Sequence, residues 1–406
     1  MLCGVLRRLG FLFLAGLLGC GFAPIPAAAA PPENVVVVPF SNLSPNRSLD
    51  WVGESLAVAA FETLFAELPF VVRPEERDTV LRQMNVRKYA PLTEATLLEI
   101  AVNLDAVLVV SGSFEATPAK EGTRAGLKIH ARILNARKLR RVKDFEVSGA
   151  FDDLSLLQAQ LAWRMLIGLK PGATTTEQDY LASHPPVRLD ALERYVRGLI
   201  ATSYDQKHKL FAAAARLQPG YSGPCYELGA LYYARRDYRS AAEWLAKVVP
   251  ADAHFREALF RLGLARYHIG DYAQSVEAFR QLAAAIPLSE VWNNLGAAQL
   301  RAGDAQAAAS FSRAIEGDPA DPDYYFNAGY ELFRKNDLEA AARQFQAALE
   351  RKPDDATAAE LLARCKRKEG GRPGDMQFEA LERLKENYDE SAWRQLKAML
   401  DPETHP

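Results

Sequence analysis

The chain has 406 residues, of which 49% are hydrophobic, and a formal net charge of −2 at pH 7. This length accommodates two or three domains, and the apolar content is enough to build their cores, which excludes a chain that is disordered throughout. The nearly balanced charge argues against a protein whose overall electrostatics attract nucleic acid.

The first thirty residues have the pattern of a secretory signal sequence. Arg7 and Arg8 precede an apolar run over 9–19, and small residues occupy 27–30. The apolar run is too short for a membrane-spanning helix, but it has the length of the hydrophobic part of a signal peptide. We therefore expect residues 1–30 to direct export and to lie outside the fold.

Two cleavage points fit this segment. The tetrapeptide LLGC, which ends at Cys20, resembles a bacterial lipobox, and cleavage there would leave Cys20 lipidated at the mature N-terminus. Ordinary cleavage near residues 28–30 fits as well. Both readings predict a periplasmic or otherwise extracytoplasmic protein. In the lipoproteins that this motif resembles, aspartate after the lipidated cysteine favours retention in the inner membrane. Gly21 stands there in this sequence, so the resemblance implies that a lipidated form would reach the outer membrane.

Residues 33–170 alternate short apolar runs with amphipathic stretches, which is typical of a small α/β domain with a mixed sheet. We expect buried strands within 35–44 and 105–114, a further strand at 70–73, and a hairpin formed by 126–134 and 142–149. Helices are expected at 50–68, 75–84, 93–104 and 154–169. Residues 171–187 have the composition of a linker.

Three motifs of this region resemble the amino-terminal domain of TolB and the related domains of curli-secretion lipoproteins. They are the segment VPFSNLS at 38–44, the tripeptide GES at 53–55, and DAVL at 105–108 leading into GSF at 112–114. The resemblance implies contacts with other envelope proteins and brings no shared catalytic residue.

The second half of the chain is repetitive. Gly229, Gly263, Gly296 and Gly329 are separated by 34, 33 and 33 residues, and an aspartate follows each glycine by eight positions. A fixed period of this length is the signature of a helical solenoid. The glycine allows two helices to cross closely, and the aspartate suits the N-cap of the second helix.

These repeats resemble the tetratricopeptide repeat, with Trp292, Leu295, Gly296, Ala308 and Pro319 as the best-matching set. We expect an all-α solenoid over 188–368, with one shortened unit, four clear units and a capping helix. A final amphipathic helix is expected at 376–401. Cys225 and Cys365 are expected to be single buried cysteines.

In the tetratricopeptide repeat family, the first helices of the units line a groove that binds a partner. Carrying the family's groove positions over to this sequence gives eleven candidate residues, with Glu257, Glu290 and Asp323 as acidic neighbours. The candidates are Tyr226, Tyr233, Phe260, Tyr267, His268, Asn293, Arg301, Phe326, Tyr330, Phe333 and Arg334. Two alternatives stay open, because the rings could pack only against neighbouring helices, or the chain's own C-terminal helix could fill the groove.

No chemistry accompanies this architecture. The six histidines are scattered without metal-ligand spacing, and no phosphate-binding loop or nucleophile elbow is present. We therefore expect no enzyme, no cofactor, no metal and no nucleic acid. The sequence predicts an exported scaffold of the bacterial cell envelope whose groove binds a partner protein or peptide. In the alternative, it is an envelope lipoprotein whose TolB-like domain regulates a cell-wall or secretion enzyme, with the repeats as a spacer.

Overall fold

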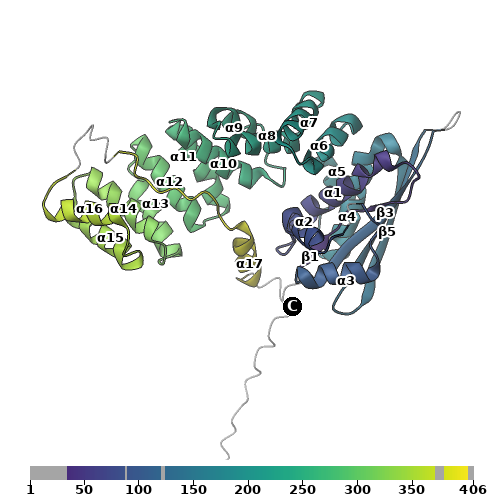
Figure 1. Cartoon of the computed structure of the whole chain (residues 1–406), viewed down its shortest axis with the longest axis horizontal. Helices are drawn as coiled ribbons and strands as arrows, with labels where there is room; N and C mark the ends of the chain where they lie inside the picture. Colours follow the sequence, from purple (N-terminus) through teal and green to yellow (C-terminus); the bar gives the residue numbers. More distant parts are fainter. Residues whose placement is uncertain (1–33, 87–88, 120–123, 371–378, 401–406) are drawn as a thin grey trace, which may run out of the picture.

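The computed structural model describes residues 34–86, 89–119, 124–370 and 379–400. An α/β domain is followed by a helical solenoid that extends away from it, and the C-terminal part of the chain runs back along the solenoid (Figure 1). The expected signal sequence and Cys20 lie outside the described residues. Within the described part of the chain, no helix combines the length and apolarity needed to span a bilayer.

The α/β domain contains a mixed sheet with the strand order β1-β3-β4-β5, and β2 also pairs with β3. The strands are β1 (Val35–Val37), β2 (Ser41–Asn42), β3 (Leu108–Thr117), β4 (Gly126–Asn135) and β5 (Arg140–Ala150). The first two strands run parallel to β3, whereas β3, β4 and β5 are antiparallel neighbours. This confirms the predicted mixed sheet. The strand expected at 70–73 contributes only one bridge, between Val71 and Val35.

Alternation along the strands divides the core of this domain between the two faces of the sheet. Val35, Val37 and Val110 pack with the helices α1 (Trp51–Glu67) and α4 (Leu154–Leu169). Val36, Val38 and Val109 pack with α3 (Glu94–Asn103), and α2 (Pro74–Gln83) contacts α3. Successive side chains of a strand point to opposite faces, which explains why an unbroken valine run suits β1.

Eleven described helices form the solenoid. They are α6 (Leu189–Ile200), α7 (Tyr204–Leu217), α8 (Ser222–Ala234), α9 (Tyr238–Leu245), α10 (Phe255–His268), α11 (Tyr272–Ala285), α12 (Ser289–Ala302), α13 (Ala307–Gly317), α14 (Pro322–Arg334), α15 (Leu338–Arg351) and α16 (Ala356–Lys366). The helices α6 to α15 pair as five successive helical hairpins, and α16 packs on α15 as the last helix. A Cβ on Gly263 would lie 2.7 Å from the ring of Phe279, so the hairpin closes only around glycine. Gly303 ends α12 with a φ of +73°, which glycine adopts at no steric cost. The solenoid prediction is confirmed.

The solenoid and the α/β domain share one hydrophobic core. Leu192 and Tyr195 of α6 and Phe211 of α7 belong to the same buried cluster as α1 and the sheet. The segment 171–187, which was predicted to be a linker, contains the helix α5 (Glu177–Ser183), and buried Tyr180 hydrogen-bonds Thr63 at 2.6 Å. The connecting stretch therefore contains a short helix, and its Tyr180 side chain docks on α1.

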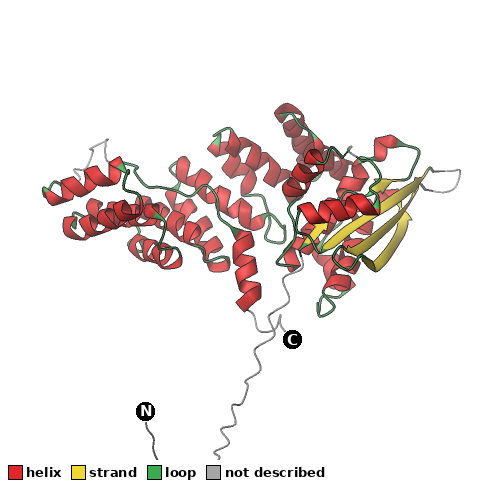
Figure 2. Cartoon of the chain, turned by 60° about the horizontal axis from the view of Figure 1, so that its bottom comes forward, coloured by secondary structure: helices red, strands yellow, loops and turns green. Residues whose placement is uncertain are grey.

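The prediction of a C-terminal helix over 376–401 is wrong for residues 379–389, which form no helix. Residues 376–378 lie outside the described residues, residues 381–389 are extended, and the helix α17 spans only Glu390–Leu400. The extended stretch crosses the helices of the solenoid (Figure 2). A helix needs the backbone N–H and C=O groups for its own hydrogen bonds, but here side chains of the solenoid bind them. Cys225 and Cys365 are free and buried.

Candidate functional site

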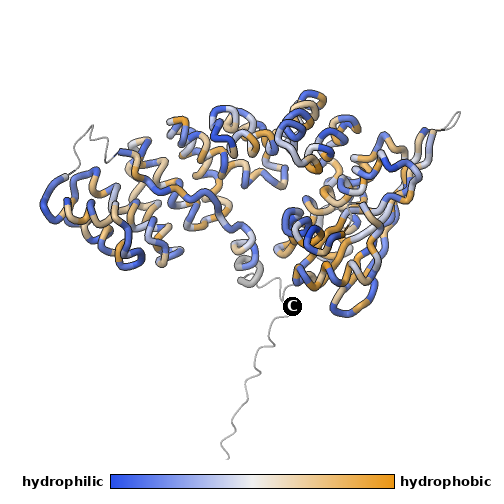
Figure 3. Tube along the Cα trace, in the orientation of Figure 1, coloured by the Kyte–Doolittle hydropathy of each residue, from blue (hydrophilic) through white to orange (hydrophobic). Residues whose placement is uncertain are grey.

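Residues 381–390, here called the tail segment, lie across the first helices of the repeats and are mainly hydrophilic (Figures 1 and 3). We call the residues of α8, α10, α12, α14 and α16 and of their N-terminal turns that contact this segment the groove. The segment is as far as 153 residues in sequence from its hydrogen-bond partners. The contacts of the groove therefore arise from the tertiary fold.

Asparagine side chains of two successive units bind the backbone of the tail segment. Asn327 Nδ2 donates to the carbonyl of Arg383, and the Arg383 N–H donates to Asn327 Oδ1, both at 2.8 Å. Asn294 makes the same pair of bonds with Lys385, also at 2.8 Å. Asn293 Nδ2 donates to the Arg383 carbonyl at 2.8 Å. All three asparagines are fully buried, so these bonds satisfy amides that water does not reach.

The N-terminal ends of α14 and α16 form an acidic pocket that consists of Asp321, Asp323 and Asp355. Arg383 Nη1 and Nη2 donate to the two carboxylate oxygens of Asp355 at 2.5 and 2.8 Å, and Nη1 also donates to Asp323 at 3.1 Å. Lys385 Nζ lies 2.6 Å from Asp321 and 2.7 Å from Asp323. Bidentate arginine–carboxylate contacts add geometric specificity to the attraction between the charges.

These ion pairs keep the acidic pocket charged. The hydrogen bond from Arg383 lowers the pKa of Asp355, and burial opposes this only in part. At Asp323 burial alone would raise the pKa, but the hydrogen bonds and charges of Lys385 and Arg383 outweigh it and lower the pKa. Burial disfavours the charged Lys385, yet the two aspartates raise its pKa. All these groups are ionised at neutral pH.

The C-terminal ends of α12 and α14 carry the opposite charge and form a basic pocket. Arg301 and Arg334 lie 4.0 and 3.8 Å from the carboxylate of Glu382, whose side chain is completely buried. Burial and then the charge of Glu382 raise the pKa of Tyr267, which adjoins this pocket. The groove therefore has an acidic side and a basic side.

The last residues of the tail segment reach the α10 end of the groove. The ring of Tyr388 lies 4.8 Å from that of Phe260, and Tyr233 Oη donates to Glu386 at 2.7 Å. Arg256 donates to buried Glu390 at 2.8 Å. Beyond the segment, Arg394 of α17 hydrogen-bonds the carbonyl of Phe65 in α1. The chain thus returns to the α/β domain at its C-terminal end.

Most of the eleven candidates lie against the tail segment. These are Tyr233, Phe260, Tyr267, Asn293, Arg301, Phe326, Tyr330 and Arg334. The remaining three pack within the solenoid. Tyr226 stacks on His254 and His268 on Tyr238, with centroids 4.5 and 4.2 Å apart, and Phe333 is buried in the core of α14 to α16. Partner binding by any of them stays a prediction.

Sequence reasoning named Asn293 and Asp323, which bind the backbone and the cations of the tail segment. It missed their neighbours with the same roles, which are Asn294, Asn327, Asp321 and Asp355. Asn294 and Asn327 each precede a repeat glycine by two positions, and this recurrence in successive units was the available signal. Asp321 and Asp355 stand at the N-caps of α14 and α16, where aspartate is common for structural reasons alone. Because helix capping already explains these two aspartates, the sequence provided no separate indication that they bind the cations of the tail segment.

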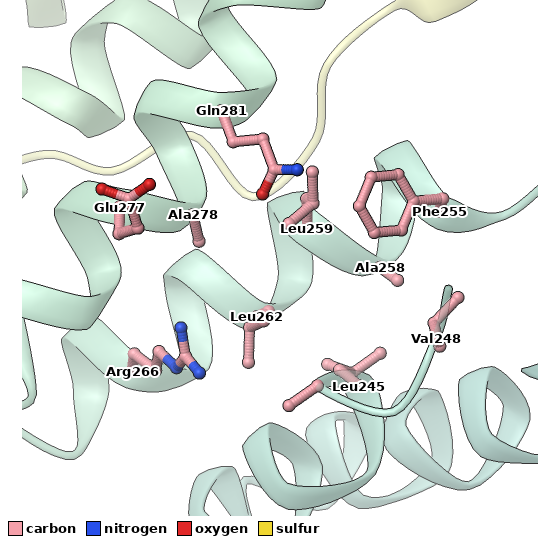
Figure 4. A pocket seen from close by; sticks show the side chains of 11 residues that line it. Leu245, Val248, Phe255, Ala258, Leu259, Leu262, Arg266, Glu277, Ala278 and Gln281 are labelled. Atoms are coloured by element: carbon pink, nitrogen blue, oxygen red, sulfur yellow. The ribbon is translucent and has the colours of Figure 1, made fainter. Parts of the chain in front are cut away.

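Two cavities adjoin these elements. A cavity of about 180 Å³ between α9, α10 and α11 has an apolar floor with Leu245, Leu259 and Leu262, and Arg266 and Gln281 also line it (Figure 4). A larger one of about 590 Å³ lies between α2, α10 and the end of the tail segment. Among the residues that the structure describes, no group of three or more His, Cys, Asp or Glu is placed to hold a metal ion.

Residues 226–290, 270–322 and 326–374 match the family model of the tetratricopeptide repeat. The repeats within residues 226–374 are tetratricopeptide repeats. The comparison with curated proteins gave no match.

Several solved structures are similar to this chain, and YrrB and TTC0263 among them are named as tetratricopeptide repeat proteins. YrrB, described as having an unusual peptide-binding site, is 19% identical with a TM-score of 0.40, over 42% of this chain and 91% of YrrB. MamA from Desulfovibrio magneticus RS-1 is 23% identical with a TM-score of 0.35, over 41% and 95% of the two chains. TTC0263, a protein of Thermus thermophilus, is 17% identical with a TM-score of 0.31, over 43% and 97%.

Proposed function

We propose that this protein is an exported, non-enzymatic scaffold of the bacterial cell envelope that binds a partner protein in the groove of its repeats. The observation that carries the proposal is the pairing of Asn294 and Asn327 with backbone groups of an extended segment. A site that binds the backbone through hydrogen bonds tolerates many side-chain sequences, as in other proteins that bind extended peptides. The groove is therefore suited to an extended stretch of polypeptide.

The tail segment occupies this groove, so a partner must replace it. A tethered ligand acts at an effective concentration that is roughly millimolar for a short flexible connection. The apparent affinity for a partner equals the intrinsic affinity multiplied by the fraction of molecules in which the groove is free. The tail segment therefore acts as a built-in competitor, and its release increases partner binding.

The rival possibility makes the tail segment a permanent structural element and the repeats a spacer for the TolB-like domain. Variants on the two sides of the same contact separate the possibilities. The double variant Arg383→Ala and Lys385→Ala weakens the binding of the tail segment to the groove but leaves every groove residue in place. The double variant Asn294→Ala and Asn327→Ala also weakens this binding, and it removes the side chains with which the groove would bind the backbone of any other segment.

The test is cross-linked capture of envelope proteins by the full-length chain and these two double variants. We expect the tail variant to capture more of a given partner than the natural chain, and the asparagine variant to capture less. Equal capture by all three would contradict the proposal. An increase in both variants would show that release of the tail segment, and not the groove, creates the binding surface.

A further inference from the structure

We infer that the partner presents an extended segment with the charge order acidic, basic, apolar, basic, as in Glu382-Arg383-Leu384-Lys385. This inference rests on the proposed function and specifies which segments the groove accepts. It follows from the way the two sides of the groove are charged.

An extended chain directs alternate side chains to opposite sides. Arg383 and Lys385 point to the acidic pocket, whereas Glu382 points to the basic pocket. Leu384, on the same side as Glu382, packs with Ala297 and Phe311. Since each side of the groove carries one kind of charge, the groove selects both the order and the register of a bound segment.

The acidic pocket requires cations. The side chain of Asp355 is only 5% exposed, and Asp321 and Asp323 share the cation of Lys385. Three carboxylates this close repel one another, and a buried charge without a partner is costly. A segment with an apolar or acidic residue at either basic position leaves these carboxylates unpaired. Such a penalty against the wrong ligand is an effective source of specificity.

The basic pocket requires an anion at the position before the first cation. The side chain of Glu382 is fully buried beside Arg301 and Arg334, which are 23% and 43% exposed. With lysine in that position, a buried cation would meet two others, and their repulsion would have no counter-charge. The basic pocket binds Glu382 and the acidic pocket binds the next residue, Arg383. A ligand with the two charges exchanged would therefore lose both sets of ion pairs.

A different protein, and not a second copy of this chain, is the occupant that this geometry favours. The tail of a second copy has the same side chains as the tethered one and no advantage in contacts. At micromolar protein concentration it competes against a tethered segment whose effective concentration is roughly millimolar. Exchange of tails between copies is therefore a minor reaction.

The test uses the full-length chain carrying Arg383→Glu and Lys385→Glu, in which the three carboxylates repel its own tail. The probe is a fluorescent peptide with the sequence of residues 379–390, EALERLKENYDE. A second peptide carries Glu382→Lys, Arg383→Glu and Lys385→Glu. We expect fluorescence anisotropy to show at least tenfold weaker binding of the second peptide.

Reciprocal changes then locate the specificity. Asp323→Lys, in a chain whose own tail carries Arg383→Ala and Lys385→Ala, should weaken the natural peptide about tenfold and improve the binding of a peptide that carries Lys385→Glu. Arg334→Glu should act in the same way with a peptide that carries Glu382→Lys. Asp323→Asn, which removes the charge without reversing it, serves where the lysine variant unfolds. Thermal melting establishes that each variant is folded.

Equal binding of the two peptides, or reciprocal pairs without recovery, would overturn the charge order but leave a peptide-binding groove. If neither peptide binds the folded, tail-released chain, the proposed function fails as well. Sedimentation velocity should show a monomer. A dimer that disappears with Arg383→Glu and Lys385→Glu would instead identify a second copy as the occupant and overturn the inference.

Discussion

The side-chain amide of Asn327 pairs with the backbone of Arg383 as a neighbouring β-strand would. It donates one hydrogen bond and accepts another, both 2.8 Å long. Asn294 repeats the arrangement at Lys385, two residues further along the tail segment. In the groove, the side-chain amides of Asn327 and Asn294, one from each of two successive repeats, therefore make the hydrogen bonds that the edge of a β-sheet would make.

The double variant Asn294→Ala and Asn327→Ala should release the tail segment. It removes four hydrogen bonds to the backbone, each worth about 1 kcal/mol, and leaves buried backbone groups without these partners. Trypsin, which cuts after Arg383 and Lys385, should cleave the variant at least tenfold faster than the natural chain. Asn387→Ala, at an exposed tail position, is the matched control and should not change the rate.

Replacement of Gly296 by alanine should destabilise the solenoid. A Cβ at this position would lie 2.7 Å from the ring of Phe311, so the two helices of the hairpin must separate. Overpacking costs about 1–3 kcal/mol and exceeds the gain of about 1 kcal/mol in helix propensity. Urea unfolding should show a lower midpoint. Gly220→Ala, where a Cβ meets nothing within 4 Å, should leave the midpoint unchanged.

Binding of the tail peptide should weaken in acid. Hydrogen bonds from Arg383 and Lys385 lower the pKa values of Asp355 and Asp323 below their ordinary value of 3.8. The ion pairs are therefore present at neutral pH and are lost as the pH falls towards the lowered values, because protonated carboxyls no longer attract the two cations. Anisotropy titrations of the tail-released chain between pH 3 and 7 should show weaker binding at pH 3 than at pH 7. Affinity that stays constant or increases down to pH 3 would contradict this assignment.

Stability should decrease as the pH rises from about 4.5 to about 9 because of two groups where α1 meets the solenoid. Burial raises the pKa of Glu62 to about 7. Burial opposes the charge on His254, but the hydrogen bond to Asp252 and the charge of Glu62 raise its pKa to about 9. Both groups bind more protons in the folded state, so stability falls as the pH rises through these values. Glu62→Gln should flatten the melting-temperature profile between pH 5 and 7.

The repeats could be predicted from the sequence because each signal is local and has its own physical cause. Gly296 allows close crossing, Asp337 caps a helix, and Gly303 takes a positive φ. These requirements recur with a fixed period whatever surrounds them. The valine run of β1 was equally informative, since both faces of this strand are buried.

The tail segment could not be predicted in the same way. Leu381, Leu384 and Tyr388 follow helical spacing, which indicated a continuous amphipathic helix. Tertiary contacts override this preference, because Asn327 and Asn294 bind the backbone groups that a helix would use. Those partners are 56 and 91 residues away in sequence, so no local pattern reveals the pairing.

Hydrogen–deuterium exchange of the backbone amides of Arg383 and Lys385 tests the central claim most directly. If the groove binds the tail segment through Asn327 and Asn294, both amides should exchange at least tenfold more slowly than in the free peptide at neutral pH. This protection should disappear in the double asparagine variant, while the helices of the solenoid remain protected. Exchange at the free-peptide rate in the natural chain would contradict the account, since the groove would then be empty in solution.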